Sequence, residues 1–214
     1  MGTLNINVGP VTVELIDDDR ICKSILGGKP FEPYSLDAWA SMCNRQNSTV
    51  IDVGAYSGLF SIAAKKLGIL DVIAFEPMPE MYDQLHENMK LNDVSFTVLR
   101  MAAAAATGKS FLFYDNKVAL TSGASLQARG NTKIEIDVIR IDDFTLGDVS
   151  AMKIDAERYE LPVLAGAKKT IEDCRPSLLV EVLTEKQRGY VEAALPQYRV
   201  RGFLDGRNLW MEPR

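Results

Sequence analysis

The sequence predicts an α/β fold, with a seven-stranded, mostly parallel sheet and helices on both faces. Three observations support this class. Apolar runs rich in β-branched residues recur along the chain, segments with helical periodicity lie between them, and an Asp-Gly pair at residues 205–206 marks a closing antiparallel hairpin. Strands that alternate with helices form parallel sheets, because each helix carries the chain back to the edge where the next strand begins.

The predicted elements follow one another in a regular order. Helices and strands alternate up to residue 99, and period-two segments within residues 107–140 then predict an inserted β-ribbon with a long loop. No internal repeat or low-complexity linker interrupts the order, so residues 1–214 form one predicted domain. The elements are strand 50–53, helix 57–67, strand 71–75, helix 79–91, strand 95–99, the ribbon, a strand ending at 154, helix 160–173, strand 177–182, a further helix and the hairpin.

Residues 1–48 are predicted to form a front piece ahead of a catalytic core at residues 49–214. Residues 35–43 have helical periodicity. This helix either packs against the edge of the sheet or acts as a lid over a ligand, with Phe31 and Glu32 at the hinge. Two further elements are expected ahead of it, a half-exposed strand at residues 11–15 and a helix that begins at the acidic residues 17–19.

The composition excludes several classes of protein. Of the 214 residues, 47% are hydrophobic and 25% are charged, as in an ordinary globular protein. No apolar run reaches the roughly 18 residues of a membrane span, and no basic region precedes an apolar one at the start, so a cytoplasmic protein without a membrane partner is expected. The net charge of −5 disfavours nucleic acid as a partner. The basic cluster of Arg199, Arg201, Arg207 and Arg214 is interrupted by acidic residues. The three cysteines form no C-x-x-C pair, so no zinc site is indicated.

The stretch TVIDVGAYSGLF, residues 49–60, carries the strongest functional signal. A buried strand ends at Asp52 and at the glycines Gly54 and Gly58, and a helix follows whose first N–H groups can meet a ligand. A dinucleotide site would have G-x-G-x-x-G for a pyrophosphate. A carboxylate in this turn repels phosphate and suits the positive charge of S-adenosylmethionine. Glu76 ends the next strand eighteen residues after Gly58, where its carboxylate could accept both hydroxyls of a ribose.

Two later stretches could line the same site. The alanine run at residues 102–106 leaves room for a flat adenine ring at Ala102 and Ala103, although such a run is also a good helix former. Residues 122–125, SGAS, lie in the ribbon loop and could face the substrate, since long loops in compact domains are often functional.

Three carboxylates follow the strand that ends at residue 154, at the edge where ligands bind in open α/β sheets. Asp155 ends a buried strand, and an otherwise unexplained charge there favours a functional role. Glu157 is a second candidate. Glu160 is better explained by the first turn of the next helix, where the helix dipole favours an acidic residue.

These motifs together resemble the FkbM-like family of S-adenosylmethionine-dependent methyltransferases. The matching stretches are VIDVGAYSGLFS, AFEPMPEMYDQLHENMKLN, IDVIRIDDF, AMKIDAERYELPVLAGA and RPSLLVEV, which follow the family's order over most of residues 49–183. The resemblance implies the Rossmann-like class I methyltransferase fold, the methionine end of the cofactor near Asp52, Gly54 and Gly58, and the ribose on Glu76. The full set of expected cofactor-binding residues is Glu32, Asp52, Gly54, Ala55, Tyr56, Gly58, Glu76, Pro77, Ala102, Ala103 and Asp155.

Two positions depart from the family pattern. Tyr56 stands where the family usually has asparagine, and Arg158 stands where it usually has glycine. Tyr56 could still stack near the methionine chain. Arg158 could pair with Asp155 or Glu157, or it could select an anionic substrate.

The reaction that the resemblance implies is methylation of a hydroxyl oxygen on a small metabolite or sugar. Asp155 is the first candidate for the base that takes the hydroxyl proton, and Glu157 is the second. A Mg²⁺ ion held by Asp155, Glu157 and Glu181 is a less favoured alternative to a base. Two other classes stay open: a cofactor-binding protein without catalysis, in which Arg158 neutralises the acidic site, and a nicotinamide-dependent oxidoreductase.

Overall fold

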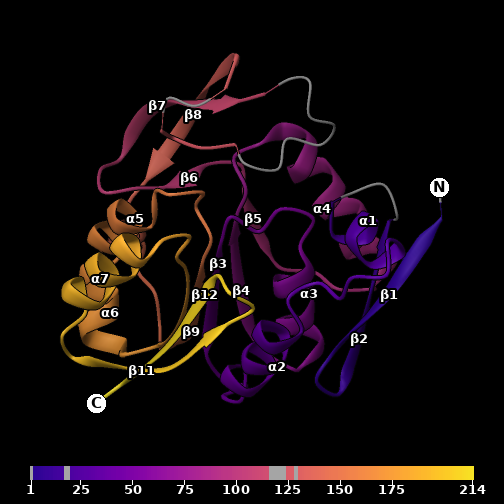
Figure 1. Cartoon of the computed structure of the whole chain (residues 1–214), viewed down its shortest axis with the longest axis horizontal. Coiled ribbons are helices and arrows are strands. Elements are labelled where there is room, and N and C mark those ends of the chain that lie inside the picture. The colour runs from indigo at the N-terminus through magenta and orange to yellow at the C-terminus, as the bar shows by residue number, and fades with distance from the viewer. Residues whose placement is uncertain (1, 17–19, 116–123, 128–129) are drawn as a thin grey trace.

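The computed structural model describes residues 2–16, 20–115, 124–127 and 130–214, and it confirms the predicted α/β class (Figure 1). A seven-stranded sheet runs through the molecule in the order β11-β12-β10-β9-β3-β4-β5. β12 is antiparallel to both of its neighbours, and the other pairs are parallel. The strands are β3 (Thr49–Val53), β4 (Asp71–Phe75), β5 (Thr97–Leu99), β9 (Val149–Ile154), β10 (Ser177–Glu181), β11 (Tyr198–Leu204) and β12 (Asn208–Pro213).

The main sheet separates two hydrophobic cores, as the side chains of β3 show. Val50 packs into one core and Ile51 into the other, because successive side chains of a strand point to opposite faces. One face is covered by α2 (Pro33–Met42), α3 (Leu59–Lys66) and α4 (Pro79–Leu91), and the other by α5 (Glu160–Gly166), α6 (Lys168–Cys174) and α7 (Glu185–Ala194). The single helix predicted at residues 160–173 is therefore two helices that meet at Ala167. No helix of the described residues is long and apolar enough to cross a membrane.

The front piece begins with a hairpin in which β1 (Thr3–Val8) pairs antiparallel with β2 (Val11–Ile16). The second of these strands is predicted from the sequence, and the first is not. The helix α1 (Arg20–Leu26) follows, and the acidic residues expected to begin it, 17–19, lie outside the described residues.

The helix α2 packs into the core of the molecule. Leu36 and Trp39 are buried, and the indole N–H of Trp39 donates a hydrogen bond of 2.9 Å to the carbonyl oxygen of Phe60 in α3. Of the two roles predicted for this helix, the contacts therefore support packing.

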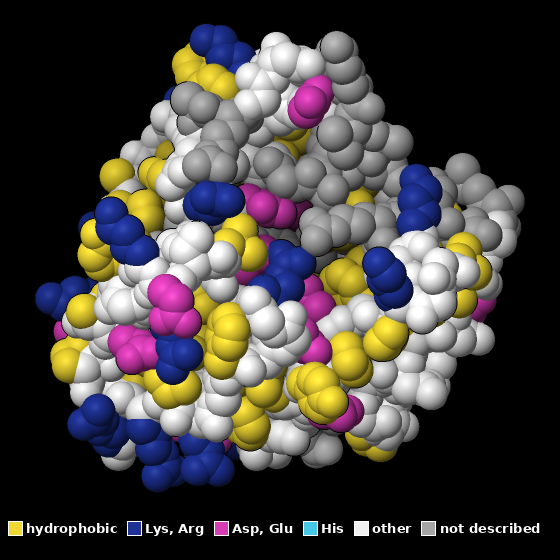
Figure 2. Space-filling model, viewed as in Figure 1, with side chains coloured by type: hydrophobic (Ala, Val, Ile, Leu, Met, Phe, Trp, Pro, Cys, Tyr) yellow, Lys and Arg dark blue, Asp and Glu magenta, His cyan; other side chains and the backbone are white. Residues whose placement is uncertain are grey.

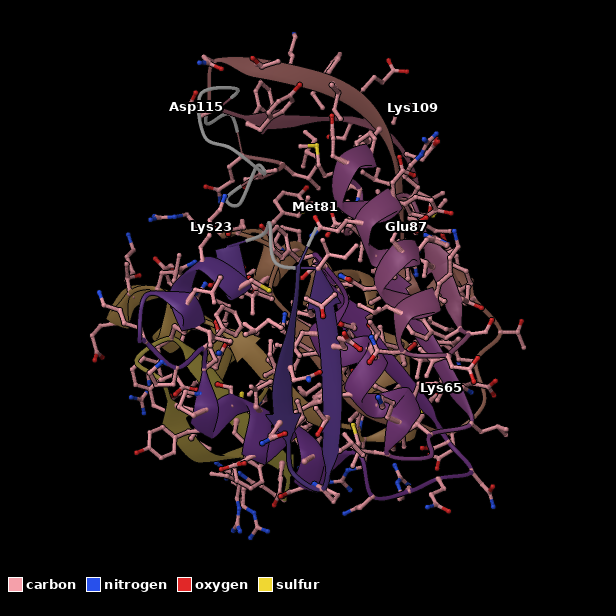
Figure 3. The ribbon with its side chains drawn as sticks, turned by 90° about the vertical axis from the view of Figure 1, so that its right-hand side faces the viewer. Lys23, Lys65, Met81, Glu87, Lys109 and Asp115 are labelled. Carbon is pink, nitrogen blue, oxygen red and sulfur yellow. The ribbon has the colours of Figure 1, made fainter. Side chains whose placement is uncertain are left out.

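A small three-stranded sheet is separate from the main sheet, and two of its strands form the β-ribbon predicted within residues 107–140. Its strands are β6 (Ala102–Ala103), β7 (Gly108–Tyr114) and β8 (Thr132–Ile139), and the 3₁₀ helix η1 (Ile141–Asp143) then leads into β9. Figure 3 shows β7 and β8 projecting above the body, beside one end of α4. The alanine run thus begins with a short strand. Of the SGAS loop, Ala124 and Ser125 are described, and residues 122–123 lie outside the described part.

Asp205 and Gly206 form the tight turn between β11 and β12, as predicted. Their φ values are 51° and 69°, the left-handed conformation that a type I′ hairpin turn requires. The Asp205 carboxylate also accepts hydrogen bonds from the N–H groups of Tyr34 (3.3 Å) and Ser35 (2.7 Å) at the start of α2. The N-cap residue Glu32 provides no side-chain cap of its own. The turn therefore caps α2 and ties the front piece to the hairpin.

Candidate active site

A cavity opens at the carboxyl ends of β3, β4 and β9, and residues of the inserted ribbon form part of its wall. Its empty volume is about 1030 Å³, including the part open to solvent. Figure 2 shows acidic and basic side chains together in the hollow on this face. The predicted site residues that line the cavity are Glu32, Gly54, Ala55, Tyr56, Glu76, Pro77, Ala102, Ala103, Asp155 and Glu157.

Gly54 allows the ends of β3 and β9 to meet. Its φ is 75°, and a Cβ atom built there would overlap the carbonyl oxygen of Asp155. The N–H of Asp155 in turn donates a hydrogen bond of 3.0 Å to the carbonyl oxygen of Val53. The turn therefore needs glycine both for its backbone angle and for the close approach of the second strand.

Glu76 is a buried carboxylate at the end of β4. Its Oε2 accepts a hydrogen bond of 2.8 Å from the N–H of Tyr56, and its Oε1 accepts one of 2.9 Å from the N–H of Met78. These bonds orient the carboxylate, and each oxygen keeps a lone pair for a donor in the cavity. Burial raises the pKa of Glu76 to about 7, against the opposing effect of the two backbone donors.

Asp52 and Gly58, both expected to contact the cofactor, lie below the cavity wall. Asp52 is fully buried, and its Oδ2 accepts a hydrogen bond of 2.6 Å from the hydroxyl of Ser61. Gly58 is the N-cap of α3 with a φ of 91°, and a Cβ there would come within 2.9 Å of the Leu85 side chain of α4. The contacts of these two residues explain the shape of the turn and the close packing of the two helices.

Lys153 lies between two of the predicted acidic residues. Its Nζ is 3.3 Å from Oδ2 of Asp155, 3.9 Å from Oδ1 of Asp52 and 4.9 Å from the centre of the Phe60 ring. Burial acts to lower the pKa of this ammonium group, but the carboxylates of Asp155, Asp52 and Glu32 outweigh burial and raise it. Among the described residues, Oδ1 of Asp52 has no hydrogen-bond donor. Lys153 therefore supplies the positive charge that balances a fully buried carboxylate.

The loop after β9 has an unusual backbone. The φ values of Glu157 and Arg158 are 49° and 77°, a region that costs a residue with a side chain roughly 1–2 kcal/mol. Glu160 occupies the first turn of α5, as predicted, and its Oε1 accepts hydrogen bonds from the N–H groups of Ala156 (3.2 Å) and Arg158 (2.9 Å). Burial raises the pKa of Glu160 to about 7. This carboxylate thus holds the loop in addition to its place at the helix start.

Arg207 joins two carboxylates at the other end of the cavity. Its guanidinium forms ion pairs with Glu32, at 3.4 Å between Nη1 and Oε1, and with Glu181. The side-chain N–H of Asn208 donates a hydrogen bond of 2.9 Å to Oε2 of Glu32. Burial raises the pKa of Glu32. Arg207 belongs to the cavity wall, which corrects its expected place in a basic cluster at the C-terminal end of the chain.

The less favoured magnesium hypothesis requires Glu181 as a ligand, together with Asp155 and Glu157. In the structure, the carboxylate of Glu181 forms an ion pair with Arg207 instead. Within residues 2–16, 20–115, 124–127 and 130–214, no group of three or more His, Cys, Asp and Glu side chains could hold a metal ion. The described residues therefore offer no support for a metal-assisted reaction.

The sequence profile of the methyltransferase FkbM domain matches residues 52–204, from the carboxyl end of β3 to the end of β11. This chain belongs to the FkbM methyltransferase family. The match includes the described residues that line the cavity, apart from Ile21, Phe31 and Glu32 of the front piece and Arg207 after the hairpin turn. The chain is therefore a methyltransferase family member with the Rossmann-like fold of that class.

Individual proteins show the same relationship. The methyltransferase sdnD of Sordaria araneosa is 27% identical in an alignment that covers 79% of this chain and 82% of that protein. The crystal structure of a methyltransferase FkbM from Methylobacillus flagellatus KT matches with a TM-score of 0.57 and 20% identity, over 82% of this chain and 48% of the other. The chain thus spans about half of that protein. A tRNA (uracil-54, C5)-methyltransferase of Pyrococcus abyssi, solved in complex with S-adenosyl-L-homocysteine, has a TM-score of 0.53 and 10% identity, over 98% of this chain and 43% of the other.

Both departures from the FkbM pattern occupy left-handed backbone positions. Tyr56 has a φ of 54° and Arg158 a φ of 77°. Asparagine and glycine tolerate this region best, so the backbone explains why the family usually has these residues there. The ion-pair partner of Asp155 is Lys153, not Arg158. In this FkbM family member, the backbone N–H of Arg158 donates a hydrogen bond to Oε1 of Glu160.

Sequence reasoning missed Lys153 and Arg207 as cavity residues. A signal exists for the first, because a lysine inside the apolar strand Val149–Ile154 has to find a buried counter-charge. Arg207 follows a hairpin turn, where an arginine is ordinary, and no local pattern distinguishes it.

Proposed function

We propose that this FkbM family methyltransferase transfers the methyl group of S-adenosylmethionine to a hydroxyl oxygen of a small molecule. The observation that carries the proposal is the placement of two carboxylates on one cavity wall, with Glu76 at the end of β4 and Asp155 at the end of β9. The glycine turn at Gly54 lies between them, because β3 pairs with both strands. One carboxylate suits a ribose and the other suits an acceptor hydroxyl.

The residues around β4 fit the cofactor. Each oxygen of Glu76 has a lone pair left for a ribose hydroxyl. Beside it, the small side chains of Ala102 and Ala103 and the apolar side chains of Met78 and Met81 line the cavity where a flat adenine ring would lie. A nicotinamide dinucleotide fits less well, because its pyrophosphate would meet carboxylates instead of a run of free N–H groups.

S-adenosylmethionine, when bound, supplies an electrophilic methyl group on a positively charged sulfur. The chain's own residues have to hold the acceptor oxygen in line, exclude water and take the hydroxyl proton. Asp155, whose side chain is 21% exposed, is the candidate for that proton transfer. Lys153 balances its charge from 3.3 Å away. Phe31 and Phe60 contribute apolar surface to the cavity.

The charge of the cavity favours a neutral acceptor. Lys153 and Arg207, the basic residues of the described lining, are each engaged with two carboxylates. No positive charge of these two residues is therefore left for a phosphate or a carboxylate of the acceptor. A small hydroxylated metabolite or sugar fits better than nucleic acid. Ile21 and Phe31 of the front piece line the cavity, which supports a covering role for the segment that precedes α2.

Calorimetric titration with S-adenosylmethionine and, in parallel, with NAD tests the cofactor. Micromolar binding of the first alone is expected. Binding of NAD, or of neither, would contradict the proposal. A screen of hydroxylated acceptors for formation of S-adenosylhomocysteine then separates an enzyme from a cofactor-binding protein without catalysis, with Asp155→Asn as the control that should bind the cofactor and not turn over.

A further inference from the structure

The loop at residues 155–158 is held from two sides by side chains of other segments. This loop carries Asp155 and Glu157 into the cavity wall. On one side, Oε1 of Glu160 in α5 accepts hydrogen bonds from the N–H groups of Ala156 and Arg158. Its other oxygen lies 3.5 Å from the side-chain N–H of Gln187 in α7, so the carboxylate itself is also fixed.

The second set of bonds comes from the inserted ribbon. The hydroxyl of Ser125 donates a hydrogen bond of 2.6 Å to the carbonyl oxygen of Glu157, and the side-chain amide of Gln127 donates one of 2.7 Å to the carbonyl oxygen of Arg158. The N–H of Gln127 donates to the Ser125 hydroxyl at 3.1 Å. Ser125 is fixed in turn by two backbone hydrogen bonds of 2.9 Å with Phe113 of β7. Side chains of the ribbon thus donate hydrogen bonds to the carbonyl groups of Glu157 and Arg158, the two residues with left-handed backbones.

These hydrogen bonds stabilise an unfavourable backbone conformation of the loop. Glu157 and Arg158 both have positive φ, and consecutive residues with side chains adopt this geometry only where the surroundings over-determine it. The described neighbours that do so are three side chains, of Ser125, Gln127 and Glu160. Leu126, between the two ribbon residues, itself lines the cavity. The ribbon therefore forms part of the site wall and also determines the backbone on which the acidic residues stand.

We propose that Ser125, Gln127 and Glu160 are positioning residues, which hold the loop at 155–158 so that its carboxylates face the acceptor. The proposal rests on the proposed function in one respect, because the effect of positioning on kcat is measured through methyl transfer. Gln127 is the most informative of the three, because its side chain is exposed and its removal leaves the core intact.

The test compares Gln127→Ala and Ser125→Ala with the pair Glu160→Ala and Glu160→Gln. Glutamine keeps an oxygen that can accept both loop N–H groups, so Glu160→Gln should behave like the wild type where Glu160→Ala does not. Gln46→Ala is the matched control, since Gln46 is exposed and precedes β3 at the opposite end of the sheet. The readouts are kcat and KM for the acceptor, the Kd of S-adenosylmethionine, and hydrogen exchange of the loop amides.

Loss of position should lower kcat by about tenfold or more, while KM and the cofactor Kd stay within about twofold of the wild type. In Gln127→Ala, the amides of Ala156 and Arg158 should exchange faster, although Gln127 touches neither N–H group. Wild-type kcat together with wild-type exchange in Gln127→Ala would overturn the proposal, as would an equal loss in Glu160→Gln and Glu160→Ala. If the wild type transfers no methyl group, the proposed function fails, and the exchange comparison alone still decides whether the ribbon holds the loop.

Discussion

The affinity for S-adenosylmethionine is expected to rise with pH around neutrality because of Glu76. Burial raises the pKa of this carboxyl to about 7, so about half of the ligand-free molecules carry it protonated at pH 7. The hydroxyls of a ribose are donors and favour the ionised form. Binding therefore releases protons, and lowering the pH through the pKa of Glu76 weakens it.

The size of the effect follows from the same bonds. Two hydrogen bonds to a charged carboxylate contribute about 1.5–3 kcal/mol each, which is more than the roughly 1.4 kcal/mol that corresponds to one pKa unit. In the complex, the pKa of Glu76 therefore falls well below 7. The affinity should then decrease roughly fivefold from pH 7 to pH 6, and only about twofold from pH 8 to pH 7.

Isothermal titration calorimetry at pH 6, 7 and 8, in two buffers that differ in ionisation heat, measures both affinity and proton release. Glu76→Ala should bind at least about 100-fold more weakly and lose the pH dependence. Asp52 and Lys153 are the charged neighbours of Glu76, and Glu160 also has a pKa of about 7. Glu160→Gln is therefore the control that must keep the wild-type pH profile. Equal wild-type affinities at pH 6 and pH 8 would refute the ribose assignment.

Three further outcomes are expected. Asp155→Asn should bind S-adenosylmethionine like the wild type and lose about 10²- to 10⁴-fold in turnover, and normal turnover would remove Asp155 from its role. Lys153→Met should lower the free energy of unfolding by about 3–5 kcal/mol in urea titrations, because it leaves Asp52 buried without a counter-charge. The double variant that also carries Asp52→Asn should recover part of this loss. No recovery would contradict the pairing of Lys153 with Asp52. Gly54→Ala should cost on the order of 3 kcal/mol in thermal unfolding, compared with a near-neutral Gly147→Ala, where a Cβ meets nothing within 4 Å.

The sheet could be predicted largely because its signals are local. The run Thr49–Val53 is buried at every position, and the Asp-Gly pair at residues 205–206 adopts the positive φ values of its turn type. The strand Thr3–Val8 was missed although Leu4, Ile6 and Val8 alternate with polar residues in period two. Of its residues only Ile6 and Val8 are buried, so the apolar face is narrow.

The site could be predicted in part, because a residue that ends a parallel strand lies at the edge where the cavity forms. This rule finds Glu76 and Asp155. It places Asp52 less well, since that residue is still inside β3 and its side chain turns toward Ser61 of the covering helix. The pair of Glu32 and Arg207 could not be found, because these residues lie far apart in sequence and only the position of β12 within the sheet brings them together.

The cap that Asp205 places on α2 has a consequence for synthesis of the chain. The bonded residues Ser35 and Asp205 are 170 positions apart, so α2 leaves the ribosome long before its cap exists. Glu32 likewise waits for Arg207 and Asn208, and β12 has to insert between two strands that precede it. Arg207 is the last of the cavity-lining residues to be synthesised. A ligand therefore meets the complete wall only after the hairpin has formed, and only then does it stabilise the finished fold in full.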